Sequence, residues 1–449
     1  MTDIETRRER PVRQRPGGPG TARPLTDVPR ARTPHDDAPH DDAPPGDAPP
    51  GDAPHGGPAP GRAAHADAAE LRALPPLVFA GECDLLRERL ARVAGGEAFV
   101  LQGGLHAKTY GRETADAIRD TLRTMMQMSA LLTYATSVPV VKVSRIAHFT
   151  DPRRLVARYQ TAAAALNLVR AFASGGYAGL RQVHAWNREF VAASPSRAGY
   201  EPLSAQLGRA LDFMDACGPG SASPADAEFF ASHEARQPVY EKELTRIDSR
   251  AGEPYSTASH FVWIGERTGD LDGAFVDHLA RLRNPIGIAL GPDCGPDEAS
   301  AHLDRFDPAR EPGRLTFVVR MGADAVRETL PAVIEKITAQ GHRAAWICDA
   351  MHPSVPLGAD GGPPGPRTFD DVLDEVTAFF EVHRALGTHP GGLHVELTGR
   401  EIGGPEDRGL QRHPAPDRVM SLPPTPCLTR AGALDLAFLV AQAYRDGSR

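Results

Sequence analysis

RLTFVVRMGADAVRETLPAVIEKITAQGHRAAWICDAMH, residues 314–352, is the stretch that decides the fold. Two short runs rich in apolar residues, 314–322 and 343–352, flank a segment, 324–340, whose apolar residues recur every three to four positions. Short apolar runs are typical of buried strands, and the three-to-four spacing is typical of a helix. The stretch therefore predicts a strand, a helix and a second strand, which is the repeating unit of a parallel sheet.

The same pattern recurs along most of the chain. Eight apolar or β-branched runs end in polar residues or glycine, at 98–104, 138–145, 177–187, 260–267, 284–292, 314–322, 343–352 and 392–399. No GxGxxG or Walker motif follows any of these runs, which weighs against a nucleotide-binding fold. Eight strand and helix units favour a closed barrel over an open sheet, so we predict an α/β fold of the (β/α)8 TIM-barrel class with an N-terminal extension.

The N-terminal segment differs in composition from the rest of the chain. Residues 1–66 contain almost no large apolar side chains and include the degenerate repeat PHDDAPHDDAPPGDAPPGDAPHGG. Such a segment cannot bury enough apolar surface to offset the entropy lost on ordering. We therefore predict a disordered tail at 1–66 and a single barrel domain, the catalytic domain, at 67–449.

Charge and cysteine content exclude several classes of protein. The formal net charge is −8, which does not suit a chain whose main partner is nucleic acid or an anionic membrane. No run approaches the roughly 18 apolar residues that a membrane span needs. The five cysteines are far apart and form no CxxC, which excludes a disulfide framework or a zinc knuckle. We expect a cytoplasmic protein that acts on small molecules and is free to form a homo-oligomer.

The ends of the predicted strands carry groups suited to a metal. In a (β/α) barrel the active site is built at the C-terminal ends of the strands. Imidazole and carboxylate side chains lie at or just beyond these ends, namely His106, His352, Glu396 and Asp417. Such groups can converge on one divalent cation, for which Mn²⁺, Co²⁺, Fe²⁺ and Zn²⁺ are the candidates. Other histidines are assigned to structural hydrogen bonding: His233, His260, His389 and His394.

A second set of side chains at the strand ends suits an anion. Arg145, Arg267 and Arg320 offer planar donor groups that match carboxylate and phosphate. Further residues at these ends are Lys142, Trp263, Glu266 and Asp349. Charged groups at strand ends are costly to bury unless they pair with each other or with a ligand. The sequence thus predicts a metal beside an anion pocket, with Lys142, Glu266 and Arg267 as the catalytic candidates.

Several motifs at these positions resemble the type II, plant-like 3-deoxy-D-arabino-heptulosonate 7-phosphate (DAHP) synthase family. They include LLTYATSVPVVKVSRIA at 131–147, HFVWIGERTGDLDGA at 260–274 and FFEVHRALGTHPGGLHVELTG at 379–399, and they follow the family order over nearly all of 67–449. The resemblance implies a metal-dependent transferase that condenses phosphoenolpyruvate with the aldehyde erythrose 4-phosphate at the entry to the shikimate pathway and aromatic amino acid biosynthesis.

The resemblance also implies roles for individual residues. Three positions match the family's metal ligands: His352, Glu396 and Asp417. The positions that match its phosphoenolpyruvate contacts are Arg145, Trp263, Glu266, Arg267 and Arg320. For these residues, the reading of the strand ends and the resemblance agree.

The chain departs from the family pattern at several positions. The family motif GGDCAE reads GGLHAK here, so His106 stands at the position of a cysteine ligand. Ala289 stands where the family has a lysine that contacts phosphoenolpyruvate. Most of the loop that grips the sugar phosphate after Arg145 is absent, and Arg367 is the only cation in the segment that replaces the family's GFKTRHFD region. We therefore expect a specialised-metabolism variant with an altered acceptor and weak activity on erythrose 4-phosphate.

Two other functions remain open on the sequence. The loss of the lysine at Ala289 leaves room for a metal-dependent lyase or isomerase, or for iron-dependent chemistry, that no longer uses phosphoenolpyruvate. A non-catalytic regulatory paralogue is the third reading. The presence of Arg145, Glu266, Arg267 and Arg320 favours an enzyme over this reading.

Overall fold

The computed structural model describes most of the chain beyond the predicted tail. The described ranges are 68–105, 115–147, 154–174, 179–217, 228–265, 273–352, 367–397, 410–412 and 426–446. All of them belong to one compact unit. The tail predicted at 1–66 lies outside the described residues, as do His106, Glu266, Arg267 and Asp417.

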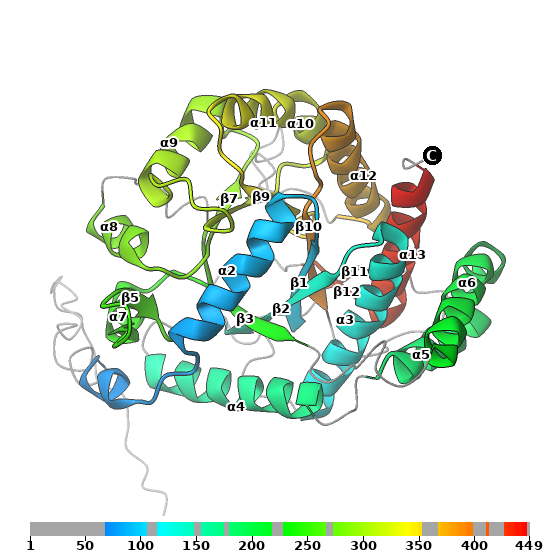
Figure 1. Cartoon of the computed structure of the whole chain (residues 1–449), viewed down its shortest axis with the longest axis horizontal. Helices are drawn as coiled ribbons and strands as arrows, with labels where there is room; N and C mark the ends of the chain where they lie inside the picture. Colours follow the sequence, from blue (N-terminus) through cyan, green and yellow to red (C-terminus); the bar gives the residue numbers. More distant parts are fainter. Residues whose placement is uncertain are drawn as a thin grey trace, which may run out of the picture. The chain divides into compact units, whose positions relative to one another are not determined.

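Eight parallel strands form a closed barrel (Figure 1). They are β1 Phe99–Leu105, β2 Val140–Ala147, β3 Phe229–Glu234, β6 Phe261–Ile264, β7 Ile286–Leu290, β8 Leu315–Val319, β9 Ala345–Cys348 and β10 Gly392–Leu397. Neighbours in this order are paired in parallel, and β10 pairs with β1 to close the barrel. The predicted (β/α)8 barrel is confirmed.

Helices surround the strands, and short strands extend the fold at two places (Figure 1). The helices are α2 Ala80–Ala94, α3 Ala115–Thr136, α4 Leu155–Ser174, α5 Leu180–Ala193, α6 Arg197–Ala216, α7 Pro238–Glu243, α8 Ala274–Arg281, α9 Pro296–Phe306, α10 Ala323–Glu328, α11 Leu330–Ala339, α12 Phe369–Ala385 and α13 Arg430–Asp446. β4 Thr245–Ile247 pairs with β5 Pro254–Ser256, and β11 Leu410–Arg412 with β12 Pro426–Leu428. No described helix is long and apolar enough to cross a membrane.

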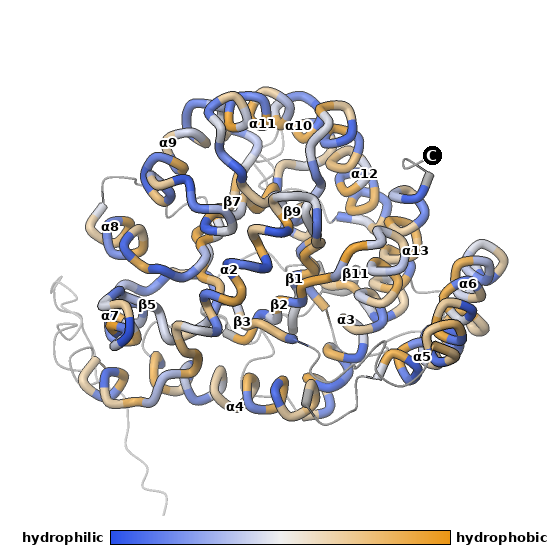
Figure 2. Tube along the Cα trace, viewed as in Figure 1, coloured by the Kyte–Doolittle hydropathy of each residue, from blue (hydrophilic) through white to orange (hydrophobic). Residues whose placement is uncertain are grey.

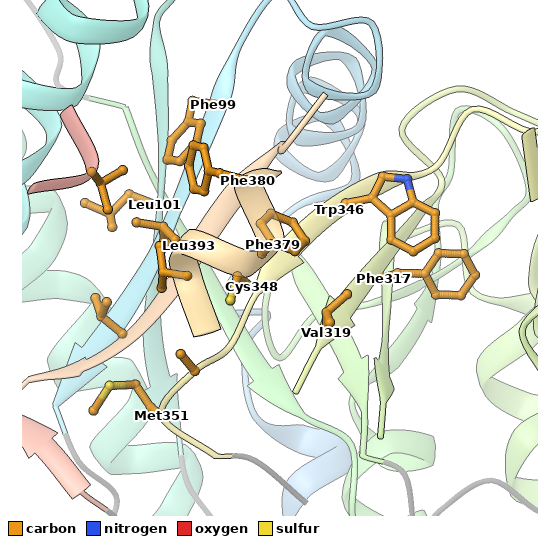
Figure 3. Close-up of a cluster of buried hydrophobic side chains, with 14 of the residues drawn as sticks. Phe99, Leu101, Phe317, Val319, Trp346, Cys348, Met351, Phe379, Phe380 and Leu393 are labelled. Atoms are coloured by element: carbon orange, nitrogen blue, oxygen red, sulfur yellow. The ribbon is translucent and has the colours of Figure 1, made fainter. Parts of the chain in front are cut away.

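Strand side chains alternate between two cores. On the outer face they pack against the helices, as Figure 3 shows for Phe99, Leu101 and Leu393 beside Phe379 and Phe380 of α12. In Figure 2 the helices of the outer ring carry both hydrophilic and hydrophobic residues along their turns. A second hydrophobic cluster lies inside the barrel. At the N-terminal ends of the strands it is covered by three residues of α2, namely Leu86, Leu90 and Val93. Because α2 covers the N-terminal ends of the strands, the site must lie at the opposite end.

The predicted strand at 177–187 is wrong. The residues from Leu180 onward form α5, whose buried side chains Val183, Trp186, Asn187 and Val191 recur at three- and four-residue spacing. The third barrel strand is instead β3, which the sequence reading did not identify. Its sequence FFASHE is short and half polar, so it lacks the long apolar run by which the other strands were recognised.

A buried carboxylate at the end of α9 makes a pH-dependent contribution to stability. Asp307 accepts a hydrogen bond from the backbone N–H of Glu311 at 2.8 Å, and burial raises the pKa of Asp307 to about 6. Because its pKa is higher in the folded than in the unfolded chain, the carboxylate lowers the free energy of unfolding as the pH rises from about 4 to about 7, by on the order of 1 to 3 kcal/mol.

We therefore predict that Asp307→Asn stabilises the protein at pH 7.5 but not at pH 4. The amide keeps the acceptor oxygen for Glu311 and removes the buried charge. The expected gain at pH 7.5 is on the order of 1 to 2 kcal/mol. Urea unfolding of both proteins at the two pH values measures it, and an equal gain at both would contradict the explanation.

Candidate active site

Arg145 and Glu396 face each other across the C-terminal end of strand β1. Both residues are in register with Gly104, Arg145 from β2 and Glu396 from β10. A Cβ atom at Gly104 would lie 2.8 Å from both the Cβ and the backbone oxygen of Arg145. Glycine at this position therefore lets the two side chains meet, and Nη1 of Arg145 donates a hydrogen bond to Oε1 of Glu396.

Arg145 is held by a second carboxylate and an aromatic ring. Its side chain is 3% exposed, and Nη2 lies 3.7 Å from Oε2 of Glu234 at the end of β3. Its guanidinium lies 5.1 Å from the ring centroid of Trp263, and that of Arg320 lies 5.2 Å from the same ring. The two arginines are thus brought to one buried aromatic side chain, which is an arrangement suited to a small polyanion.

Glu396 offers one buried oxygen atom to a ligand. Burial alone would raise the pKa of Glu396, but Arg145 and the nearby imidazoles hold it below its usual value, so the group is ionised. Among the described residues, Oε2 of Glu396 has no hydrogen-bond partner. A buried, ionised oxygen without a partner is costly unless a cation or donor binds it.

His352 is oriented toward Glu396 by Asp349. Nδ1 of His352 lies 3.0 Å from Oδ1 of Asp349, and Nε2 lies 3.8 Å from Oε1 of Glu396. Burial would raise the pKa of Asp349, but His352, His394 and Arg320 hold it well below its usual value. The ionised Asp349 accepts the Nδ1–H of His352, which directs Nε2 of His352 toward Glu396.

His394, which the sequence assigns to structural hydrogen bonding, also lies in this cluster. Its Nε2 lies 3.4 Å from Oε1 of Glu396, and its ring centroid lies 5.7 Å from that of His352. Ligand atoms of Asp349, His352 and His394 lie within 4.8 Å of one another, close enough to hold one metal ion. The signal that was missed is the two-residue period of a strand, which places His394 on the same face of β10 as Glu396.

Glu234 is a second residue that the sequence reading missed. It forms an ion pair with Arg236, whose Nε lies 2.8 Å from Oε1 of Glu234, in addition to its ion pair with Arg145. Its carboxylate reaches the site because it ends β3, the strand that was not predicted. The segment SHEA at 232–235 does occur among the family-like motifs, and that was the available signal.

Lys142 does not join the other candidates. It lies three positions before Arg145 on β2, so it faces the other side of the strand. Its Nζ donates to the carbonyl of Val140 at 3.3 Å and lies 5.7 Å from the ring centroid of Phe229, and burial lowers its pKa. The predicted catalytic placement of Lys142 is therefore not what the structure shows.

Ala289 lies at the inner face of β7 beside a cavity. Its neighbours Ile288 and Leu290 belong to the outer core, so alternation directs Ala289 inward. A cavity of about 190 Å³ borders Ala289, but its described lining comes largely from the outer core and from α8 and α9, as for Ile288, Val276 and Phe306. Ala289 thus adds no positive charge to the inner face of β7, and the cavity lies on the side of the strand that faces α8 and α9.

Comparison with known proteins agrees with this geometry. The model of the class-II DAHP synthetase family matches residues 60–149 and 148–441. A Streptomyces coelicolor protein named phospho-2-dehydro-3-deoxyheptonate aldolase is 50% identical over 425 aligned residues, which cover 86% of this chain and 93% of the relative. Phospho-2-dehydro-3-deoxyheptonate aldolase AroG of Mycolicibacterium smegmatis is 42% identical, with 86% of this chain and 91% of that protein covered. The chain belongs to the class-II DAHP synthetase family.

Proposed function

We propose that this protein is a metal-dependent transferase that condenses phosphoenolpyruvate with an aldose phosphate or a related aldehyde. The proposal rests on one observation. Arginines suited to an anion lie next to imidazole and carboxylate groups suited to a metal, at the same end of the barrel. Arg145 and Arg320 flank Trp263, and the ion pairs of these arginines lead directly to Glu396 and Asp349 beside His352. The names of the relatives at 50% and 42% identity support this chemistry over a non-catalytic role or a reaction without phosphoenolpyruvate.

The anion pocket suits phosphoenolpyruvate because this substrate carries a carboxylate and a phosphate. Guanidinium groups bind both through paired, charge-assisted hydrogen bonds. In the proposal, Arg145 and Arg320 hold the two anionic groups over the ring of Trp263. Glu266 and Arg267, which follow β6 in the sequence, complete the contacts.

The residues present also suit a divalent metal. The Nε2 atom of His352 and the unpartnered Oε2 of Glu396 are the described donors, and His106 and Asp417 are the further proposed ligands. A bound Mn²⁺, Co²⁺, Fe²⁺ or Zn²⁺ would polarise the aldehyde carbonyl of the acceptor. With His106 in place of a cysteine, all four proposed ligands are nitrogen or oxygen donors, which suits the harder of these cations.

We propose that the acceptor differs from erythrose 4-phosphate and belongs to specialised metabolism. Arg367, the one cation in the segment that replaces the family's lysine-bearing region, donates to Oε2 of Glu375 at 2.7 Å and to the carbonyl of Asp371 at 2.9 Å. The segment offers no second cation that could bind a sugar phosphate while Arg367 keeps these bonds. We further propose a cytoplasmic homo-oligomer in which residues 67–449 are the catalytic domain.

Elemental analysis of the purified protein, followed by calorimetric titration of phosphoenolpyruvate into the Mn²⁺-loaded form, tests the proposal. We expect one metal per chain and saturable binding. Product formation is then measured with erythrose 4-phosphate, other aldose phosphates and unphosphorylated aldoses. Metal without phosphoenolpyruvate binding would contradict the proposed donor substrate, and turnover of erythrose 4-phosphate at the rate of an ordinary family member would contradict the altered acceptor.

Restoring a lysine on β7 is expected to tighten phosphoenolpyruvate binding. Ala289 is directed into the barrel, so a lysine there would bring its ammonium group to the inner face of β7, and one charge-assisted hydrogen bond contributes about 1.5 to 3 kcal/mol, or at least about tenfold in affinity. Calorimetry on Ala289→Lys measures the gain. Ala289→Met is the matched control, because it fills the same space without a charge and should not tighten binding; equal affinities for the two variants would contradict the prediction.

A further inference from the structure

We propose that Asp349 is a positioning residue that couples the metal site to the anion pocket, so that metal and phosphoenolpyruvate each strengthen the binding of the other. The inference rests on the proposed function. It assigns a role to a residue that follows β9 and that neither contacts the substrate nor holds the metal itself.

The Asp349 carboxylate joins the two halves of the site. Its Oδ2 accepts a hydrogen bond from Nη2 of Arg320 at 2.6 Å, and its Oδ1 lies 3.0 Å from Nδ1 of His352. The side chain is completely buried, so water does not compete for these bonds. One rigid group therefore fixes an arginine of the anion pocket and a proposed metal ligand.

The close spacing of Asp349, His352 and His394 makes Asp349 a candidate ligand, but its own bonds argue against that role. Oδ1 also accepts the backbone N–H of Met351 at 3.2 Å, and Oδ2 is within 3.2 Å of Nδ1 of His352. Both oxygens are thus engaged with donors. In contrast, Oε2 of Glu396 has no partner among the described residues, which makes Glu396 the better ligand.

The bond to His352 determines which imidazole nitrogen can bind a metal. An ionised carboxylate only accepts hydrogen bonds, so the proton of His352 must be on Nδ1. Nε2 faces Glu396 and is the ring nitrogen left to bind a metal. Hydrogen-bonded partners of this kind fix the tautomer and ring orientation of metal-bound histidines, and their loss costs about 10- to 100-fold in metal affinity.

The shared carboxylate makes the coupling reciprocal. A metal bound by His352 holds Asp349 in place and with it the Arg320 guanidinium, so the anion meets a preorganised donor. By thermodynamic linkage, phosphoenolpyruvate must then raise the metal affinity by the same factor. In typical coupled systems that factor is about 5- to 150-fold.

Asp349→Asn tests the proposal because the amide keeps the shape of the side chain but has one acceptor oxygen in place of two, so it cannot accept hydrogen bonds from both Arg320 and His352. Metal affinity is measured by competition calorimetry with and without phosphoenolpyruvate, and the visible absorption of the Co²⁺-loaded protein reports the ligand geometry. We expect about 10- to 100-fold weaker metal binding, an altered Co²⁺ spectrum and a coupling factor near 1. The matched control is Asp307→Asn, a buried aspartate change that should leave all three unchanged.

Arg320→Lys provides a second variant for the case in which Asp349→Asn does not fold. Lysine keeps the charge but cannot reproduce the arginine geometry, so metal affinity should fall several-fold although Arg320 is not a ligand. Unchanged metal affinity in this variant, or wild-type coupling in Asp349→Asn, would overturn the inference. If the wild-type protein binds neither metal nor phosphoenolpyruvate, the proposed function fails and the coupling fails with it. Binding of both by the wild-type protein without mutual enhancement overturns the coupling alone.

Discussion

Replacing Arg145 with methionine is expected to weaken phosphoenolpyruvate binding by at least about 100-fold and to lower the free energy of unfolding by about 3 to 5 kcal/mol. The side chain is almost completely buried and pairs with Glu396 and Glu234. Methionine fills a similar volume but leaves Glu396 without its strongest cationic partner. Breaking one side of a buried ion pair is costly because the remaining charge stays in a poorly hydrated place.

Calorimetry with phosphoenolpyruvate and urea unfolding measure the two effects. The matched control is Arg314→Met, since Arg314 is equally buried but donates to the backbone carbonyls of Phe306, Asn284 and Ala280, near the N-terminal ends of β7 and β8. We expect this control to lose stability and keep ligand affinity. Equal loss of affinity in both variants would show that the effect comes from general destabilisation and not from the anion pocket.

Arg145→Lys should regain much of the stability and little of the affinity, because it keeps the charge without the planar donor pair.

The barrel was predictable from sequence because its strands are buried on both faces. Strands such as β7 and β8 are continuous apolar runs, and such runs are visible in the sequence. β3 is different, because its inner face carries Ser232 and Glu234, which bond to Gln102 and Arg145. Its polar residues are satisfied by partners that only the folded barrel brings near, so its sequence alone resembles a loop.

The site was predictable in its chemistry but not in all of its members. Histidine and carboxylate groups at strand ends indicated a metal, and the structure brings His352 and Glu396 together. Lys142 could have been separated from Arg145 by counting positions, since residues three apart on a strand point in opposite directions. The role of Asp349 could not be found in this way, because it depends on the distance between the ends of β8 and β9.

The second large effect is expected for Glu396→Gln, which should raise the metal dissociation constant by more than about 100-fold. Loss of a residue that only orients a metal ligand costs up to about that factor, and Glu396 is proposed to bind the metal itself. Glutamine keeps the size of the side chain but removes the negative charge that faces Arg145, His352 and His394. Elemental analysis after dialysis should find little metal in the variant, and phosphoenolpyruvate titrated with Mn²⁺ present should bind as it does without added metal.

Glu241→Gln is the matched control for this substitution. Glu241 is also completely buried, has one oxygen 2.8 Å from an imidazole, that of His233, and has its other oxygen without a partner among the described residues. It lies on α7, against the outer face of β3, so its loss should lower stability and leave one metal per chain. If both variants lost the metal, the cause would be general unfolding of the barrel and not the loss of a ligand. If only Glu396→Gln loses it, the buried oxygen of Glu396 binds the cation, because the two glutamates differ chiefly in the face of the barrel on which they lie.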